Sequence, residues 1–220
     1  MRVLVVSPHP DDETLGAGGT ILRFMREGNE VFWLNVTAML DENKFSKECI
    51  VNREVQLRNI DKFYGFADTY HLNFPSTELE MVDSSKAIEI IGNIVNEVKP
   101  QVMILPDYND AHSDHARVFD WCYAGSKAFR FPFINKILTM EIVSETDYGR
   151  PDHPFVPNYF IDITEYIDQK IQALKIYDTE LGQPPFPRSE ENVRALARVR
   201  GASAGVNYAE AFRLIKCIEK

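Results

Sequence analysis

The sequence has little cysteine, no long apolar run and no excess of positive charge. Its 220 residues include three cysteines, which are odd in number, lie far apart and form no C-x-x-C pair. This pattern excludes a disulfide framework and a thiolate metal site, and it is typical of a reducing compartment. No stretch approaches the ~18 consecutive apolar residues of a membrane span. The apolar run that starts at Val3 stops at Ser7, too early for a signal peptide. We therefore expect a cytoplasmic protein that does not enter a membrane.

The charge balance is acidic. Asp and Glu outnumber Lys and Arg by 33 to 24, which gives a formal charge of −9. This balance disfavours binding to nucleic acid or to an anionic membrane surface, because both carry negative charge. A composition of 45% hydrophobic and 26% charged residues is that of a globular protein. The length allows one large domain and the hydrophobic pattern has no linker, so we expect a single domain over residues 1–220.

Short apolar runs alternate with helical patterns along the chain. The runs are β-branched and aliphatic, as in strands that are buried on both faces. Strands are expected at 3–6, 31–36, 102–105, 136–145 and 159–163. Helices are expected at about 15–28, 47–64, 84–99, 165–177 and 189–199. This alternation predicts an α/β fold with a Rossmann-like, mostly parallel sheet flanked by helices.

Polar clusters follow two of the expected strands, at the position where parallel α/β sheets bind ligands. One cluster runs from Ser7 to Glu13, and the other runs from Asp107 to His115. Three of the five histidines, His9, His112 and His115, fall in these clusters. Imidazole and carboxylate ligands without a thiolate suit a catalytic zinc, which keeps one coordination position open for water.

Each of these residues taken alone has a simpler explanation. Asp11 or Asp12 would cap the following helix by accepting its unpaired amide hydrogens. His112 and His115 would be ordinary polar residues at another helix start. The combination of His-x-x-Asp after one strand with His-x-x-His after another favours a metal site.

The same residues resemble the motifs of a known family. Pro8-His9-Pro10-Asp11-Asp12-Glu13, with the glycines that follow it, and His112-Ser113-Asp114-His115 are similar to signatures of the PIG-L/LmbE-like N-acetylglucosaminyl deacetylases. Ser113 stands where the family usually has proline, a departure that keeps the histidine spacing. Weaker matches extend over nearly the whole chain, at Arg53-Glu54, 162–164, Lys170, Arg200-Gly201 and 208–212.

The resemblance implies a zinc-dependent N-deacetylase, with iron(II) able to fill the same ligands. It assigns metal binding to His9, Asp12 and His115, the role of general base to Asp11, and a place near the developing oxyanion to His112. The substrate would be an N-acetylglucosamine-type sugar or conjugate, and the products acetate and a free amino sugar.

Three further roles follow less directly from the resemblance. Arg53 matches a position that the family uses at the substrate, with an exposed helical arginine as the equal alternative. Asp110 stands where some relatives carry a tyrosine that assists catalysis. This departure leaves open which residue, if any, serves as an extra acid or as a substrate contact. Glu13 is expected to orient the neighbouring metal-ligand segment, residues 9–12, rather than to take part in the chemistry.

Other functions fit parts of the sequence. A dinucleotide fold is disfavoured because Ile21 stands where the third glycine of G-x-G-x-x-G would be, and we interpret Gly16, Gly18 and Gly19 as allowing close packing of helix and sheet. A non-haem iron oxygenase shares the ligand types, but its usual β-barrel does not match the βαβ pattern. A sugar-binding protein without catalysis and another metal-dependent amidohydrolase stay open, as does a homo-oligomer.

Overall fold

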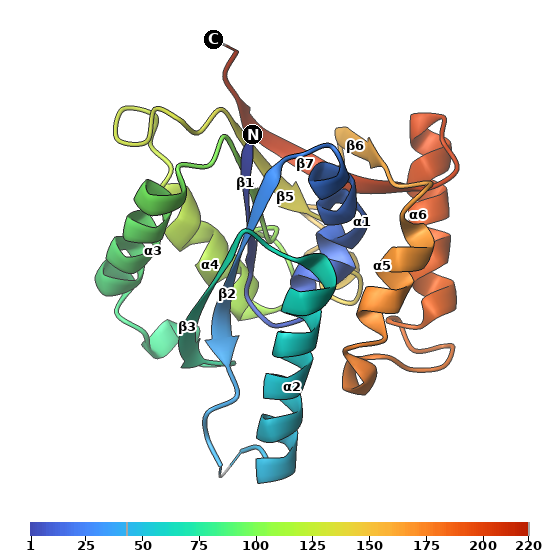
Figure 1. Cartoon of the computed structure of the whole chain (residues 1–220), viewed down its shortest axis with the longest axis horizontal. Coiled ribbons are helices and arrows are strands. Elements are labelled where there is room, and N and C mark those ends of the chain that lie inside the picture. The colour runs from blue at the N-terminus through green and yellow to red at the C-terminus, as the bar shows by residue number, and fades with distance from the viewer. Residues whose placement is uncertain (43, 220) are drawn as a thin grey trace.

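A sheet of seven strands runs through the middle of the molecule in the order β3-β2-β1-β4-β5-β7-β6 (Figure 1). This computed structural model describes residues 1–42 and 44–219. The strands are β1 (Arg2–Ser7), β2 (Glu30–Ala38), β3 (Asp68–Pro75), β4 (Val102–Leu105), β5 (Lys136–Met140), β6 (Tyr159–Asp162) and β7 (Ala209–Cys217). Neighbours among β1 to β5 are parallel, whereas β7 runs antiparallel to both β5 and β6. The predicted mostly parallel α/β fold is confirmed.

Helices cover both faces of the sheet (Figure 1). One core contains Val3 and Val5 of β1 together with residues of α1 (Asp12–Arg26), α2 (Lys47–Tyr64), α5 (Ile167–Leu174) and α6 (Glu190–Ala204). The other contains Leu4 and Val6 together with residues of α3 (Ser84–Val98) and α4 (Ser113–Ala124). Successive side chains of a strand point to opposite faces, so one short apolar run supplies both cores. Three 3-10 turns, η1 (Leu79–Met81), η2 (Thr146–Tyr148) and η3 (Asp178–Glu180), lie in the connections.

The structure differs from the sequence prediction in four elements. β3, α4 and β7 were not predicted, and β5 ends at Met140 rather than at residue 145. β3 is an edge strand with partly exposed side chains, so it lacks a continuous apolar run; its signal is the alternation of Tyr70, Leu72 and Phe74. Beyond β5 the chain turns out of the sheet, and Ser144 adopts a left-handed φ of 76°. The buried apolar residues at 142–143 therefore belong to a loop and not to a strand.

Two glycines of α1 allow it to lie close to its neighbours. A Cβ atom on Gly16 would be 2.7 Å from Cγ of Met140, which belongs to β5. A Cβ atom on Gly19 would be 2.7 Å from Cγ2 of Ile163, directly after β6. The interpretation of these glycines as packing positions is confirmed.

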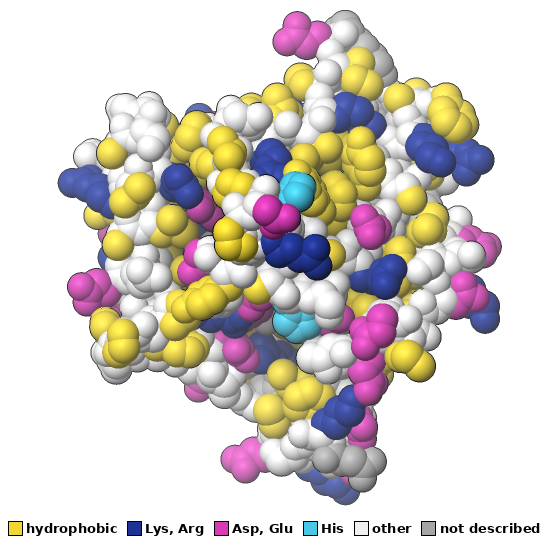
Figure 2. Space-filling view, turned by 180° about the vertical axis from the view of Figure 1, so that it is seen from behind, with side chains coloured by type: hydrophobic (Ala, Val, Ile, Leu, Met, Phe, Trp, Pro, Cys, Tyr) yellow, Lys and Arg dark blue, Asp and Glu magenta, His cyan; other side chains and the backbone are white. Residues whose placement is uncertain are grey.

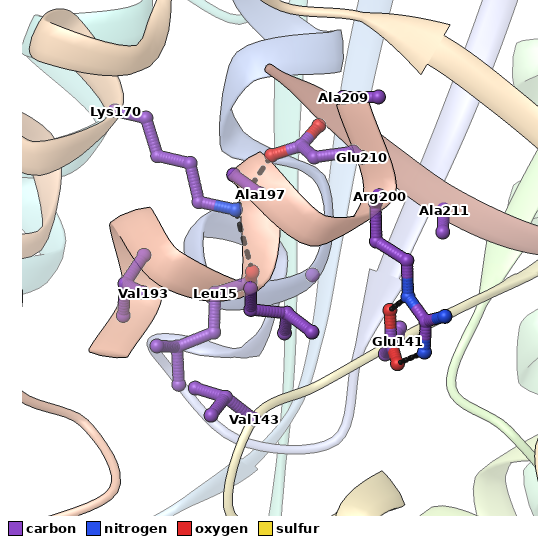
Figure 3. A pocket seen from close by; sticks show the side chains of 12 residues that line it. Leu15, Glu141, Val143, Lys170, Val193, Ala197, Arg200, Ala209, Glu210 and Ala211 are labelled. Carbon is purple, nitrogen blue, oxygen red and sulfur yellow. Dashed lines mark hydrogen bonds and ion pairs between the residues drawn. The ribbon is translucent and has the colours of Figure 1, made fainter. Parts of the chain in front are cut away.

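A buried ion pair ties α5 and β7 to the middle of α1 (Figure 3). Lys170 Nζ lies 2.7 Å from Glu210 Oε1 and donates to the carbonyl oxygen of Leu15 at 2.7 Å. The Glu210 carboxylate also accepts from the backbone amides of Gly19 and Thr20, at 2.9 and 2.7 Å. Both charged groups are buried and have several polar partners, which offsets the cost of removing them from water. The pair therefore fixes the position of α1 on the sheet.

The surface carries charges of both signs. On the face that Figure 2 draws, the Lys and Arg side chains are interspersed with Asp and Glu. Within residues 1–42 and 44–219, no helix is both long enough and apolar enough to cross a bilayer.

The packing of α1 predicts opposite effects for the same substitution in two helices. Gly19→Ala is expected to lower the free energy of unfolding by about 1–3 kcal/mol, because its Cβ would overlap a branched, buried side chain. Gly92→Ala in α3 is expected to raise it by up to about 1 kcal/mol, because its Cβ would meet only Phe131, at an ordinary 3.8 Å, and alanine favours helix. Urea unfolding of both variants measures the difference, and equal effects would contradict the packing argument.

Candidate active site

The two polar clusters lie beyond the carboxyl ends of β1 and β4, which are neighbours in the centre of the sheet. From β1 the chain continues into α1, which packs in one core, and from β4 into α4, which packs in the other. The strand order reverses at this point, and such a reversal opens a crevice at the carboxyl edge of the sheet. Residues about 100 positions apart are thereby brought together, as the pattern predicted.

His9, Asp12 and His115 form a compact set of donor atoms. Asp12 Oδ2 lies 3.4 Å from His9 Nδ1 and 3.3 Å from His115 Nε2. One nitrogen or oxygen from each of the three residues lies within 4.8 Å of the others. His115 Nε2 is buried and has no hydrogen-bond partner among the described residues. Two imidazole nitrogens and one carboxylate oxygen are ligands that zinc and iron(II) accept, so these residues fit a divalent cation.

Two further carboxylates hold the outer sides of the histidine rings. Asp114 Oδ2 lies 3.0 Å from His9 Nε2, and Asp110 Oδ2 lies 2.8 Å from His115 Nδ1. Each ring therefore has one nitrogen bound to a carboxylate and the other directed at Asp12. Such outer partners fix the tautomer and the direction of a ligating histidine. A second group, His9, His112 and Asp114, also has ligand atoms close together, but Asp114 already accepts from His9 and from the Thr77 amide.

The carboxylates favour positive charge on these histidines. Burial disfavours a charged His115, but the negative charge of the nearby Asp12 carboxylate and the hydrogen bond to Asp110 outweigh this effect and raise the pKa of His115 to about 10. Burial also lowers the pKa of His9, but the interactions of its ring with the Asp114 and Asp12 carboxylates outweigh this effect and raise the pKa to about 9. A divalent cation would supply positive charge here in place of protons, since ligating histidines are neutral.

Asp11 occupies the N-cap position of α1 but does not use its side chain as a cap. Its carbonyl oxygen accepts from the amides of Thr14 and Leu15, and its carboxylate is 2.6 Å from Arg188 Nη1. The capping interpretation of Asp11 is therefore wrong. Asp12 Oδ2 accepts from the amide of His9, which precedes the helix, and so does not cap α1 either. Burial and the Asp12 carboxylate raise the pKa of Asp11 well above its ordinary value, and the Arg188 guanidinium opposes this rise.

His112 is the N-cap residue of α4, directly before the helix, and its ring lies beside that of His9, with 4.5 Å between the ring centroids. Its Nδ1 accepts a hydrogen bond of 3.1 Å from the amide of Asp114, so His112 caps the start of α4. His115, in contrast, is fully buried and belongs to the donor set. Burial and the nearby positive charge of His9 lower the pKa of His112 to about 4. Because Nδ1 is an acceptor, the proton of the neutral ring is on Nε2.

These groups surround a cavity of about 170 Å³, which is smaller than many drug-sized sites. Its charged and imidazole side chains are His9, Asp11, Arg53, His112, Glu145, Glu180 and Arg188. The remaining lining is small or apolar and comes from Pro10, Thr37, Ala38, Met39 and Ser76. The cavity therefore borders the three donor residues through His9 and the candidate base through Asp11.

Comparison with known proteins gives the family. The sequence model of PIG-L, described as GlcNAc-PI de-N-acetylase, matches residues 4–124, more than half of the chain. The chain belongs to the PIG-L family.

The chain is 24% identical to the diacetylchitobiose deacetylase of Thermococcus kodakarensis over 97% of this chain and 83% of that protein. It is 33% identical to a probable N-acetyl-alpha-D-glucosaminyl L-malate deacetylase 2 of Bacillus cereus, over 52% of this chain and 56% of the other. A crystal structure of a conserved protein from Thermus thermophilus superposes with a TM-score of 0.78 at 26% identity, covering 99% of this chain and 96% of the other.

The structure gives definite positions to the three weaker PIG-L candidates. Arg53 lines the cavity and is buried, not an exposed helical arginine; it donates to the carbonyl oxygen of Pro10 at 3.1 Å and pairs with Glu180. Asp110 contacts His115 Nδ1 and does not line this cavity. Glu13 is fully buried and accepts from the Asp11 amide at 3.1 Å and from the Tyr177 hydroxyl at 2.9 Å.

Four charged residues of the site were not singled out from the sequence. Asp114 stands inside the His-x-x-His segment, and its spacing to the histidines was the available signal. Glu145, Glu180 and Arg188 lie in connections after β5 and before α6, where neither periodicity nor a motif marks them. They reach the cavity only through the tertiary fold.

The donor set predicts different metal contents for two histidine variants. His115→Ala is expected to lose most of its bound zinc, because Nε2 of this residue points into the donor set. His112→Ala is expected to keep zinc and to lose about 1 kcal/mol of stability from the helix cap. Elemental analysis of purified, zinc-reconstituted variants gives the metal per chain, and equal contents would overturn the assignment of ligands.

Proposed function

We propose that this protein is a metal-dependent N-deacetylase that hydrolyses the acetamido group of an N-acetylglucosamine-type sugar or conjugate. PIG-L relatives are named for deacetylation of such sugars. The observation that carries the proposal is the carboxylate of Asp11, which adjoins the metal-fitting residues, lines the cavity and is not used to cap its helix. It is thus available for proton transfer.

We infer that His9, Asp12 and His115 hold the metal, with zinc as the ion that the donor types favour and iron(II) as the alternative. When bound, the ion supplies positive charge that polarises the acetamido carbonyl and lowers the pKa of water. Asp110 and Asp114 keep the two imidazole rings directed at Asp12. The free thiols of Cys49, Cys122 and Cys217 support the cytoplasm as the compartment.

Asp11 acts as the general base. Its carboxylate accepts a proton from the water that attacks the carbonyl carbon, and it returns this proton to the nitrogen when the C–N bond breaks. The bond that forms is C–O and the bond that breaks is C–N, so the products are acetate and the free amine. The raised proton affinity of a buried carboxylate suits both transfers.

His112 stabilises the carbonyl oxygen as it becomes negatively charged. Its Nδ1 is occupied by the helix amide, so Nε2–H is the donor that remains for the cavity. A neutral imidazole donates this hydrogen bond without giving up its proton. Positioned donors of this kind typically contribute about 10²–10³ in rate.

The charge of the cavity supports a neutral substrate. Three carboxylates, those of Asp11, Glu145 and Glu180, line it together with two guanidinium groups. Both Arg53 and Arg188 are already paired with Glu180. An anionic group on a substrate would therefore find both arginines already paired. It would also lie close to the three carboxylates, and such like-charge contacts are unfavourable. We therefore favour a neutral sugar such as diacetylchitobiose over a malate conjugate.

The base assignment predicts distinct phenotypes for adjacent aspartates. Asp11→Asn is expected to keep its zinc and to lower kcat for acetate release by about 10²–10⁴-fold, because the amide does not accept the proton. Asp12→Asn is the matched control and is expected to lose zinc and activity together. Retained activity in zinc-loaded Asp11→Asn would refute the role of Asp11.

The preference for a neutral substrate is tested with N-acetylglucosaminyl malate in two forms, the charged free acid and the neutral dimethyl ester, with diacetylchitobiose beside them. The wild-type protein is expected to release acetate from diacetylchitobiose and from the dimethyl ester of N-acetylglucosaminyl malate. Its kcat/KM for the free malate conjugate is expected to be lower than for the ester by about tenfold or more. Equal values would contradict the preference for a neutral substrate, and sugar binding without acetate release would favour a sugar-binding protein.

A further inference from the structure

Arg188 makes an unusually dense set of contacts at the edge of the cavity. Its Nη1 lies 2.6 Å from Asp11 Oδ2 and 3.3 Å from Glu180 Oε2, and its Nη2 lies 3.3 Å from Glu145 Oε1. Its Nε donates to Ser144 Oγ at 2.7 Å. The side chain is only 16% exposed. All three guanidinium nitrogens therefore have defined partners, and three of those partners are carboxylates.

The backbone does not by itself determine where the Asp11 carboxylate points. Asp11 has a φ of 123°, a conformation that residues other than glycine rarely adopt, and its side chain makes no hydrogen bond to the helix that it precedes. The Asp11 amide is held by Glu13, which fixes the backbone. Arg188 supplies the hydrogen bond that the structure shows to the carboxylate itself.

Charge repulsion would displace this carboxylate if it were not compensated. The Asp12 carboxylate is adjacent to Asp11 in the sequence, and Glu180 and Glu145 line the same cavity as Asp11. The Arg188 guanidinium lies between Asp11 and these two glutamates and is held by them. Because Arg188 holds Oδ2, the other oxygen of Asp11, Oδ1, would be the one that accepts the proton.

We propose that Arg188 is a positioning residue that holds Asp11 Oδ2 and thereby directs the general base at the reacting water; this role rests on the proposed deacetylase function. The planar guanidinium is required because it binds Asp11, Glu145 and Ser144 in three fixed directions at once. A lysine ammonium is a single point of charge and would keep only part of this geometry. Arg188 acts through Asp11 and takes no part in the proton transfer.

The test compares Arg188→Met and Arg188→Lys with wild type, using the N-acetyl sugar that the wild type cleaves best. We expect Arg188→Met to lower kcat by about 10- to 100-fold, as for a misplaced catalytic group, with KM changed less than about threefold and zinc content unchanged. Arg188→Lys should recover part of the lost kcat. Methylguanidine added to an Arg188→Ala variant should also raise kcat.

Arg194→Met is the matched control, because Arg194 lies on α6 and pairs with Asp168 and Glu190 away from the cavity. It removes the same charge and should leave kcat, KM and zinc content unchanged. The proposal is overturned if Arg188→Met keeps kcat within twofold, loses zinc in parallel with activity, or changes KM alone. A wild-type protein that releases acetate from no N-acetyl sugar would overturn the proposed function as well, whereas an active wild type with an unaffected Arg188→Met overturns only the role of Arg188.

Discussion

Oδ2 of Asp12 joins the two halves of the site, and much of the fold is needed to place it. This oxygen contacts His9 Nδ1, His115 Nε2 and the amide of His9. Asp12 is the first residue of α1, and His115 lies in the first turn of α4, on the opposite face of the sheet. The contact therefore requires β1 to lie beside β4, and it requires α1 to sit close to the sheet. Gly16 and the Lys170–Glu210 pair secure the second condition.

The same contact explains the distribution of charge around it. A buried carboxylate is stable only with compensating charge or hydrogen bonds, and each compensating group here brings a partner of its own. The histidines are held by Asp110 and Asp114, and Arg188 is shared by Asp11, Glu145 and Glu180. Six of the 33 acidic residues lie in the two sequence clusters, so outside them acids exceed bases by only three. Much of the acid excess of the chain is therefore concentrated at the two strand ends where His9, Asp12 and His115 could hold a metal ion.

The central fold was predictable because buried parallel strands have a distinctive sequence. Val3–Val6 and 102–105 are continuous apolar runs, and both are strands in the structure. Their adjacency follows from common α/β topology, and with it the meeting of His9 and His115. β3 and β7 were missed because strands at or near the edge of the sheet are partly exposed and carry mixed side chains. Arg188 was missed for another reason: its contact with Asp11 spans 177 positions and depends on how two loops fold.

The residues of the site that could be predicted from the sequence and those that could not occupy different parts of the fold. The residues that fit the metal, together with Asp11 and His112, follow β1 and β4 and lie within the segment that the PIG-L model matches. Glu145, Glu180 and Arg188 lie after residue 124 and complete the cavity from loops. Loops tolerate change better than strand ends that are buried between helices. Relatives named for different N-acetyl sugars can therefore share the donor residues while the loops differ. Under the proposed deacetylase function, the donor residues and Asp11 would determine which bond is broken, and the charges on these loops would determine which sugar is bound.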